Sequence, residues 1–318
     1  MPTIAVIGGT GAQGGSVVNQ LLKNGTWKIR VLTRNANNDS AKALTSKGVE
    51  VVSADVNDEA SLVKAFEGVT AVFATTAYWP SVPTLGRDGA GEEETEQLIK
   101  IANAAGRTPS LEHFIVSTLP PADKVSGGKL KVPHFDYKQK AVAWIKENKP
   151  ELYGKMSQIW PGWYTSNLVA LPMGKFWPIP YAGYIWAQPS KPDALLPIAG
   201  NLDYNFGIVV EGLLNAKEKA FGKHAVCITD YLPMTDVVKT FEEVTGKPAI
   251  YAEISDEAIT HQFSIFGAEF AAQLRWSEQY PKWDQLDPEN NISLAQLGVQ
   301  DKLMGFKDAL KELGDKVL

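Results

Sequence analysis

Short apolar runs alternate with amphipathic stretches over the first half of the chain. The strand-like runs lie at residues 4–7, 29–33, 49–53, 71–75, 111–117 and 156–160. The stretches with helical spacing of apolar residues lie at 16–22, 41–44, 58–66, 92–105 and 135–147. Parallel strands need crossover helices, and these helices cover both faces of the sheet. The alternation therefore predicts an α/β protein with a Rossmann-type doubly wound parallel sheet.

The pattern changes after residue 161. Aromatic and proline residues crowd 177–189, helix-like stretches lie at 206–215 and 235–245, and residues 247–254 form a late candidate strand. Thr235 is predicted to be the N-cap of its helix, although Val238 stands where a capping box needs Glu or Gln. We interpret this half as a smaller α+β region on the substrate side, without internal repeats.

Composition limits the class of protein. A chain of 318 residues with 44% hydrophobic and 21% charged residues can bury a large core and is typical of soluble globular proteins. Its net charge of −5, without a basic run, argues against direct binding to nucleic acid. The N-terminus lacks a signal-peptide pattern, and no stretch reaches ~18 uninterrupted apolar residues, so we expect no membrane contact and a location in the cytoplasm, or in cytoplasm and nucleus.

A glycine-rich turn follows the first strand. Gly8, Gly11 and Gly14 are spaced G-x-x-G-x-x-G at the mouth of the first helix. Such glycines let the chain turn tightly and let the backbone approach a pyrophosphate, while helix N–H groups face its charge. The turn therefore predicts dinucleotide binding, and the alternative is a turn that merely needs positive φ. Thr10 and Gln13 are either additional contacts or solvated loop positions.

The end of the second strand indicates which dinucleotide is bound. Twenty residues after Gly14, where an NAD-binding protein usually has Asp or Glu, the chain has Arg34. A guanidinium can form charge-assisted hydrogen bonds with the 2′-phosphate of NADP(H), with Asn35 assisting, whereas a carboxylate would repel it. We therefore expect NADP(H) as the cofactor. The alternative is that Arg34 is an ordinary surface residue.

Two further strand ends add candidates. Asp55 follows the third strand and could meet the adenine amino group or serve as a helix N-cap. Thr75 and Thr76 close the fourth strand, where the crevice at the carboxyl ends of the strands should lie.

Four motifs together resemble a known family, the NmrA-like atypical short-chain dehydrogenases/reductases. They are GGTGAQGGS at 8–16, LTRN at 32–35, TAYW at 76–79 and HFDYK at 134–138. The resemblance is specific from residue 3 to about 170 and looser beyond it. Relatives include fungal nitrogen-regulation repressors, a mammalian NADPH-sensing protein and plant reductases of the isoflavone and phenylcoumaran benzylic ether type.

The resemblance implies a cofactor site and a domain division. Residues 1–155 would form the NADP-binding Rossmann domain, and residues 156–318 a smaller region for substrate or partner, part of which returns to the sheet. The residues implied to contact the dinucleotide are Gly8, Gly11, Gln13, Gly14, Arg34, Thr76, Tyr78, Lys138 and, within 161–167, Pro161, Tyr164 and Asn167.

The proton-donating pair of ordinary short-chain dehydrogenases is absent. Those enzymes use Tyr-x-x-x-Lys on one helix, and no tyrosine here has a lysine four positions later. Lys138 is the best catalytic candidate, because it matches the lysine of the reductase branch, but it could equally serve only to bind the nicotinamide ribose. Ser117 matches the usual catalytic serine, or merely lines the crevice.

The remaining chemistry-bearing residues give weaker signals. The four histidines and Cys227 lack metal-ligand spacing, so no metal site is expected, and Cys227 lies in an apolar run that favours a core position. An aromatic run could line a pocket for an apolar substrate, pack in the core or form a partner surface. Its members are Trp160, Trp163, Tyr164, Phe176, Trp177, Tyr181, Tyr184 and Trp186.

Two functions fit these features. The first is an NADPH-dependent reductase of a small apolar or aromatic substrate. The second is a redox sensor, a transcriptional regulator in which NADP⁺ and NADPH change the affinity for a protein partner. The sequence favours the reductase slightly and leaves the oligomeric state open.

Overall fold

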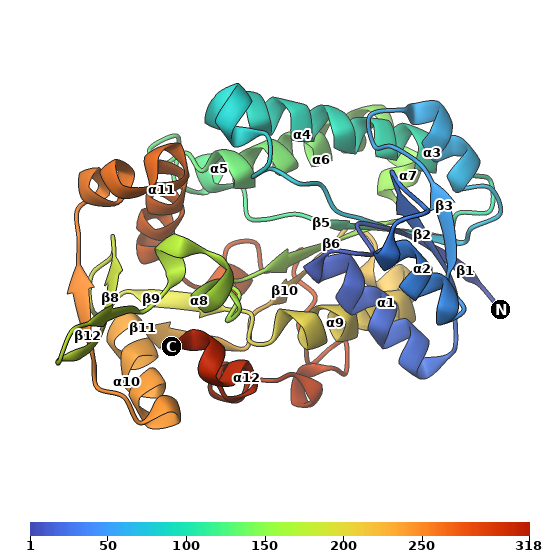
Figure 1. Cartoon of the computed structure of the whole chain (residues 1–318). Coiled ribbons are helices and arrows are strands. Elements are labelled where there is room, and N and C mark those ends of the chain that lie inside the picture. Colours follow the sequence, from blue (N-terminus) through green and yellow to red (C-terminus); the bar gives the residue numbers. More distant parts are fainter.

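The apolar runs of the first half form neighbouring parallel strands in a computed structural model that describes residues 1–318 (Figure 1). The seven strands run in the order β10-β6-β5-β4-β1-β2-β3, which confirms the predicted doubly wound sheet. They are β1 (Thr3–Ile7), β2 (Lys28–Thr33), β3 (Glu50–Ser53), β4 (Ala71–Ala74), β5 (His113–Ser117), β6 (Met156–Pro161) and β10 (His224–Cys227).

Helices cover both faces of this sheet. Alternate strand residues point to opposite sides, and both sets are apolar, so each face needs a layer of helices to bury it. Ile4 and Val6 of β1 pack in one cluster with α1 and α9, whereas Ala5 and Ile7 pack in another with α3, α4 and α6. The two layers are visible below and above the sheet in Figure 1. The helices are α1 (Ala12–Asn24), α2 (Asp39–Ser46), α3 (Glu59–Ala65), α4 (Val82–Gly106), α5 (Ala122–Val125), α6 (Pro133–Asn148), α7 (Pro150–Tyr153) and α9 (Leu202–Ala216).

The second half of the chain contributes to this core. Strand β10 pairs in parallel with β6, and its Cys227 is completely buried, as expected from the apolar run. Helix α9 crosses α1 so closely that a Cβ on Gly207 would overlap the carbonyl oxygen of Ser16. The Gly207 N–H donates to the Ser16 hydroxyl at 2.8 Å. A glycine is needed at this crossing because two backbones meet there.

The rest of the second half forms a smaller α+β region (Figure 1). One sheet contains β7 (Trp177–Ile179), β8 (Gly183–Gln188) and β12 (Ala249–Glu253), and the other pairs β9 (Leu195–Ile198) with β11 (Asp230–Pro233). The helices here are α8 (Asn167–Ala170), α10 (Met234–Thr245), α11 (Asp256–Gln279) and α12 (Phe306–Leu313). Short 3-10 turns lie at Pro172–Gly174, Lys217–Ala220, Trp283–Gln285, Gln300–Lys302 and Gly314–Val317.

The predicted N-cap of α10 is wrong. The helix begins at Met234, so Thr235 lies inside it. The backbone N–H groups of Met234 and Thr235 donate instead to the carbonyls of Ala194 and Pro192. A distant segment thus satisfies the free N–H groups that a side-chain cap would serve.

Helix α4 also starts earlier than the predicted residue 92. It begins at Val82 and contains a break at Gly86, which has φ 73°. Glycine permits this left-handed conformation, so the segment before the break packs at a different angle. None of the helices in the structure combines the length and apolar content needed to cross a membrane.

Candidate functional site: a cleft at the carboxyl ends of the strands

A cleft of about 790 Å³ lies at the carboxyl edge of the large sheet. The ends of β1 to β6 and the start of α1 line it, and α6 and α11 close its other end. The strand order reverses direction at the β1–β4 pair, which is the point where doubly wound sheets bind ligands. Apart from Asn35, every cofactor-site residue predicted from the sequence lines this cleft.

The glycine-rich turn opens the cleft at the N-terminus of α1. Gly8 has φ 73°, and a Cβ on Gly14 would overlap the Gly8 carbonyl oxygen. Gly11 is the N-cap of α1, without a side-chain cap, and the first turn of the helix holds no acidic residue. A positive φ therefore explains the need for glycine only at Gly8. The other two glycines provide a close turn and a helix end whose N–H groups are free for an anion.

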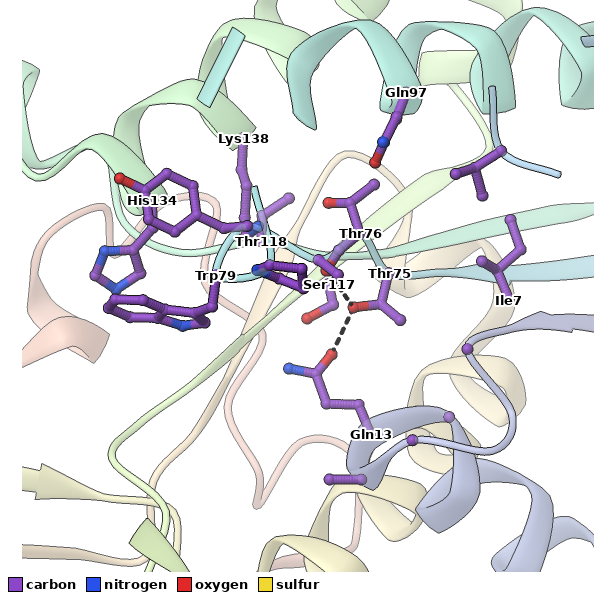
Figure 2. Close-up of a pocket in the computed structure, with 18 of the residues that line it drawn as sticks. Ile7, Gln13, Thr75, Thr76, Trp79, Gln97, Ser117, Thr118, His134 and Lys138 are labelled. Atoms are coloured by element: carbon purple, nitrogen blue, oxygen red, sulfur yellow. Dashed lines mark hydrogen bonds between the residues drawn. The ribbon is translucent and has the colours of Figure 1, made fainter. Parts of the chain in front are cut away.

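Gln13 links the end of β4 to the segment that follows β6. Its side-chain carbonyl accepts a hydrogen bond from Thr75 Oγ1 at 3.0 Å (Figure 2). Its amide donates to the Tyr164 hydroxyl at 2.8 Å. Burial raises the pKa of Tyr164 to about 12, so this hydroxyl keeps its proton. Gln13 is therefore a half-buried structural bridge and not a solvated loop position. Thr10, by contrast, is exposed at the rim.

Arg34 lies at the end of β2 on the rim of the cleft. Its side chain is exposed and makes no hydrogen bond or salt bridge within the protein. Asn35 points elsewhere, because its side-chain oxygen accepts the Asn37 N–H at 3.0 Å. The rim thus presents one unpaired guanidinium, with no carboxylate at the end of this strand.

Asp55 lines the cleft beyond β3 and is not a helix cap. Its carboxylate accepts the Asn57 N–H at 2.9 Å in a local turn, whereas Asp58 caps α3 by accepting the Ala60 N–H at 3.0 Å. The N-cap alternative for Asp55 is therefore wrong, and the residue remains available to a ligand.

Lys138 enters the cleft from α6 and forms a buried ion pair with Glu94 of α4. Thr76 Oγ1 donates to the same Glu94 oxygen at 2.7 Å, while the second Glu94 oxygen has no partner. Sequence reasoning missed Glu94. The sequence does hold a signal for it, because Glu94 shares the buried face of α4 with Gly91 and Leu98, and a carboxylate is rarely buried without a partner.

A second buried carboxylate, Glu269 of α11, lies behind the cleft wall, where it contacts His134, one helical turn before Lys138 on α6. It accepts hydrogen bonds from the His134 backbone N–H at 2.9 Å, from His134 Nδ1 at 2.5 Å and from Arg87 Nε at 2.5 Å. Burial alone would raise the pKa of Glu269, but the His134 bonds and the Arg87 charge hold it below its usual value. Glu269 is therefore an anion that positions two groups from the first half of the chain.

The tyrosines near Lys138 and His134 are engaged elsewhere. Tyr78 donates to the Arg87 carbonyl at 2.9 Å, and burial raises its pKa far above the usual value. Tyr137 donates to Asp88 at 3.0 Å and does not line the cleft. Ser117, at the end of β5, is buried in the cleft wall, with no hydrogen bond from its side chain to the protein.

The aromatic run divides between roles. Trp163 and Tyr164 line the cleft, together with Pro161 and Asn167. The others pack in the core or lie on the small sheet. Trp160, Phe176 and Trp186 are buried, Tyr184 is half-buried, and Trp177 and Tyr181 are exposed.

The sequence profile of the NmrA-like family matches residues 1–305. This chain belongs to the NmrA-like family. Among its relatives, the NmrA-like family domain-containing oxidoreductase FrzB of Cladobotryum sp. is 29% identical over 262 residues, covering 79% of this chain and 76% of the relative. The oxidoreductase himF of Aspergillus japonicus is 28% identical over 301 residues, covering 88% and 86%.

A similar solved structure has the same fold as this NmrA-like chain. It is that of NmrA, a negative transcriptional regulator, in complex with NADP. It superposes with a TM-score of 0.78 at 19% identity and covers 98% of this chain and 95% of the other.

Proposed function

We propose that this NmrA-like protein binds NADP(H) in the cleft and reduces a small apolar or aromatic carbonyl compound with NADPH. The observation that carries the cofactor assignment is the unpaired guanidinium of Arg34 at the end of β2. Charge-assisted hydrogen bonds from Arg34 to a 2′-phosphate would contribute ~1.5 to 3 kcal/mol, about ten- to a hundredfold in affinity. The structure of the related regulator NmrA in complex with NADP supports the assignment.

The cleft fits the other parts of a dinucleotide. The free N–H groups at the start of α1 would bind the pyrophosphate, and Gly11 leaves its approach open, since a Cβ there would meet only the Gly8 carbonyl at 3.4 Å. Asp55 would accept the adenine amino group, and Tyr164 and Asn167 would flank the nicotinamide half.

When bound, NADPH would supply a hydride from its nicotinamide ring. Lys138 has three N–H donors, of which Glu94 takes one, so the others could hold the ribose hydroxyls and orient the ring. The Ser117 hydroxyl would donate to a carbonyl oxygen of the substrate. Lys138 also offers a positive charge close to the oxygen on which negative charge develops.

The far end of the cleft supports the substrate class. Trp79, Phe270 and Trp283 line it, and Trp79 stacks on Phe266 with ring centroids 6.2 Å apart. Flat aromatic walls favour apolar or aromatic ligands. The fungal relatives FrzB and himF are named as oxidoreductases, which agrees with a redox reaction.

NADPH oxidation in the presence of aromatic aldehydes, ketones and quinones tests this function. We expect turnover with at least one compound, and we expect Lys138→Ala to lose it while NADPH binding survives. Lys140→Ala is the matched control, because Lys140 is exposed on the same helix. A native protein without turnover across the panel, or a Lys138→Ala variant with native turnover, would contradict the proposal.

A redox sensor is the second candidate. Lys138 pairs with Glu94, and no tyrosine hydroxyl contacts the lysine. The cleft therefore lacks the tyrosine–lysine pair that ordinary short-chain dehydrogenases use for turnover, which favours a sensor. A sensor requires NADP⁺ and NADPH to stabilise different states. Identical hydrogen–deuterium exchange in the two cofactor complexes would exclude this function, whereas different exchange on the cleft-lining segments would support it.

A further inference from the structure

The cleft contains a titratable side chain that the proposed reduction does not yet use, the imidazole of His134. It lies four residues, or one helical turn, before Lys138 on α6, so both side chains leave the same face of the helix. Both line the cleft, on the same side as Trp79 (Figure 2). In ordinary short-chain dehydrogenases the proton-donating tyrosine stands at this spacing from its lysine. His134 therefore occupies the position from which a proton donor is missing.

Glu269 fixes the orientation of this imidazole. The same carboxylate oxygen binds the His134 backbone N–H and the Nδ1 atom, so it holds the residue at two points. Glu269 is 0% exposed, and Arg87 binds its other oxygen at 2.5 Å. A carboxylate on Nδ1 selects the tautomer in which Nδ1 carries hydrogen, and it stabilises the imidazolium.

The second ring nitrogen of His134 is left available. Nε2 has no hydrogen-bond partner in the protein. The atom is also not sealed inside the protein, unlike the fully buried polar atoms that lack a partner. The ring packs against the Trp79 indole, with centroids 5.2 Å apart, and against Phe135 at 4.6 Å. The imidazole is thus held by its edge and its faces, while one nitrogen remains open to a ligand in the cleft.

Other proton donors in the cleft are less suitable. The Tyr78 hydroxyl donates to the Arg87 carbonyl, and the Tyr164 hydroxyl already accepts a hydrogen bond from the Gln13 amide. Lys138 is already in an ion pair with Glu94. Only His134 combines a fixed orientation, an open nitrogen and a place one turn from Lys138.

We propose that His134 is the proton donor of the reduction and that Glu269 is its positioning residue, an inference that rests on the proposed reductase function. The carbonyl carbon of the substrate gains a C–H bond by hydride transfer from NADPH as the C=O π bond breaks. The carbonyl oxygen takes the proton from Nε2 of the His134 imidazolium, whose N–H bond breaks. The carbonyl is reduced to an alcohol that keeps this proton, NADPH is oxidised to NADP⁺, and a new proton from the solvent restores the His134 imidazolium.

The first test needs neither cofactor nor substrate. Nitrogen NMR of the native protein with ¹⁵N-labelled histidine reports which ring nitrogen carries hydrogen, and the His134→Asn variant assigns the His134 signal among the four histidines. We expect the Nδ1–H tautomer for neutral His134 and an increase of the Nε2–H tautomer in Glu269→Gln. A native His134 that is mainly in the Nε2–H form would overturn the positioning role.

The second test measures reduction of 9,10-phenanthrenequinone, an aromatic dicarbonyl probe, by NADPH. We expect His134→Asn to lower kcat by at least about a hundredfold, the usual contribution of general acid catalysis, with an unchanged Kd for NADPH. His261→Asn, an exposed histidine on α11, is the control and should keep native kcat.

The outcomes separate the two proposals. Turnover by the native protein together with a kcat within threefold of native in His134→Asn would overturn the role of His134 and leave the reductase function standing. No reduction of this quinone or of the other carbonyl compounds by the native protein would contradict the reductase function itself, and the role of His134 with it.

Discussion

Arg34 is the residue on which the proposed cofactor preference depends, because its guanidinium is exposed at the cleft rim without a protein partner. Arg34→Asp should weaken NADPH binding by about ten- to a hundredfold or more, since it removes the charge-assisted bonds and adds repulsion. NADH, which lacks the 2′-phosphate, should lose much less. Fluorescence titration of both cofactors measures the two Kd values.

The control for this charge reversal lies on the same strand. Lys28 is exposed at the opposite end of β2, so Lys28→Asp makes the same change in net charge far from the cleft. It should leave both Kd values unchanged. Equal losses for NADPH and NADH in Arg34→Asp would remove Arg34 from the phosphate site.

Local sequence patterns identified some site residues and could not identify others. Arg34 and the glycines are recognisable because their positions relative to one strand and one helix carry the signal. Glu94 and Glu269 lie inside long helices, and their partners come from other segments of the chain. A charged residue on a helix acquires its role only when packing buries it, so neither contact could be deduced from spacing alone.

At the scale of elements, the junction of β1 and α1 gives a test with an internal control. A Cβ on Gly14 would overlap the Gly8 carbonyl oxygen, so Gly14→Ala must displace the turn. We expect the free energy of unfolding to fall by about 1 to 3 kcal/mol and NADPH binding to weaken at least tenfold. Urea denaturation and calorimetric titration measure the two effects.

Gly15→Ala is the matched variant one residue further along α1. Its Cβ would lie 3.7 Å from the Gly9 carbonyl, an ordinary contact, and alanine favours a helix over glycine by up to about 1 kcal/mol. The variant should be as stable as the native protein or more so. If Gly14→Ala behaved in the same way, the close turn would not be required.

The elements themselves were predicted well where their signal was local. The strands of the large sheet from the first half match the apolar runs, whereas the start of α4 and the cap of α10 were misplaced. The two errors have different causes. A short helical segment joins α4 across the break at Gly86, and carbonyls from a distant segment bind the first N–H groups of α10. Neither feature is visible in hydrophobic periodicity.

At the scale of the whole molecule, buried histidines link stability to pH. Burial lowers the pKa of His113 and of His224 to about 4, from 6.5 in an unfolded chain. The unfolded chain therefore binds more protons between these values, and acid favours unfolding. We expect the free energy of unfolding to fall by roughly 2 kcal/mol per histidine between pH 7 and pH 5, measured by urea denaturation.

His224→Phe checks the source of this dependence. The His224 ring stacks on Trp160 with centroids 3.7 Å apart, and its Nε2 has no partner, so a phenyl ring can replace it without losing a hydrogen bond. The variant should lose about half of the slope that the two histidines produce. An unchanged slope would mean that other groups control acid unfolding.

The whole-molecule arrangement also limits what the sequence could reveal. Strand β10 and helix α9 come from the second half but complete the sheet and its helical layer. Residues of α11 reach the cleft from a distant part of the chain, as the His134–Glu269 separation of 135 residues shows. The division of the chain near residue 155 stays a prediction, because both halves build the large sheet and the cleft.

Calorimetric titration of the native protein with NADPH and with NADH under the same conditions tests the proposed cofactor preference. Binding of NADPH in the cleft with Arg34 at its 2′-phosphate predicts one site per chain and a Kd for NADPH at least about tenfold lower than that for NADH. Equal Kd values for the two cofactors, or no binding of either, would contradict an NADP(H) site with Arg34 at the 2′-phosphate.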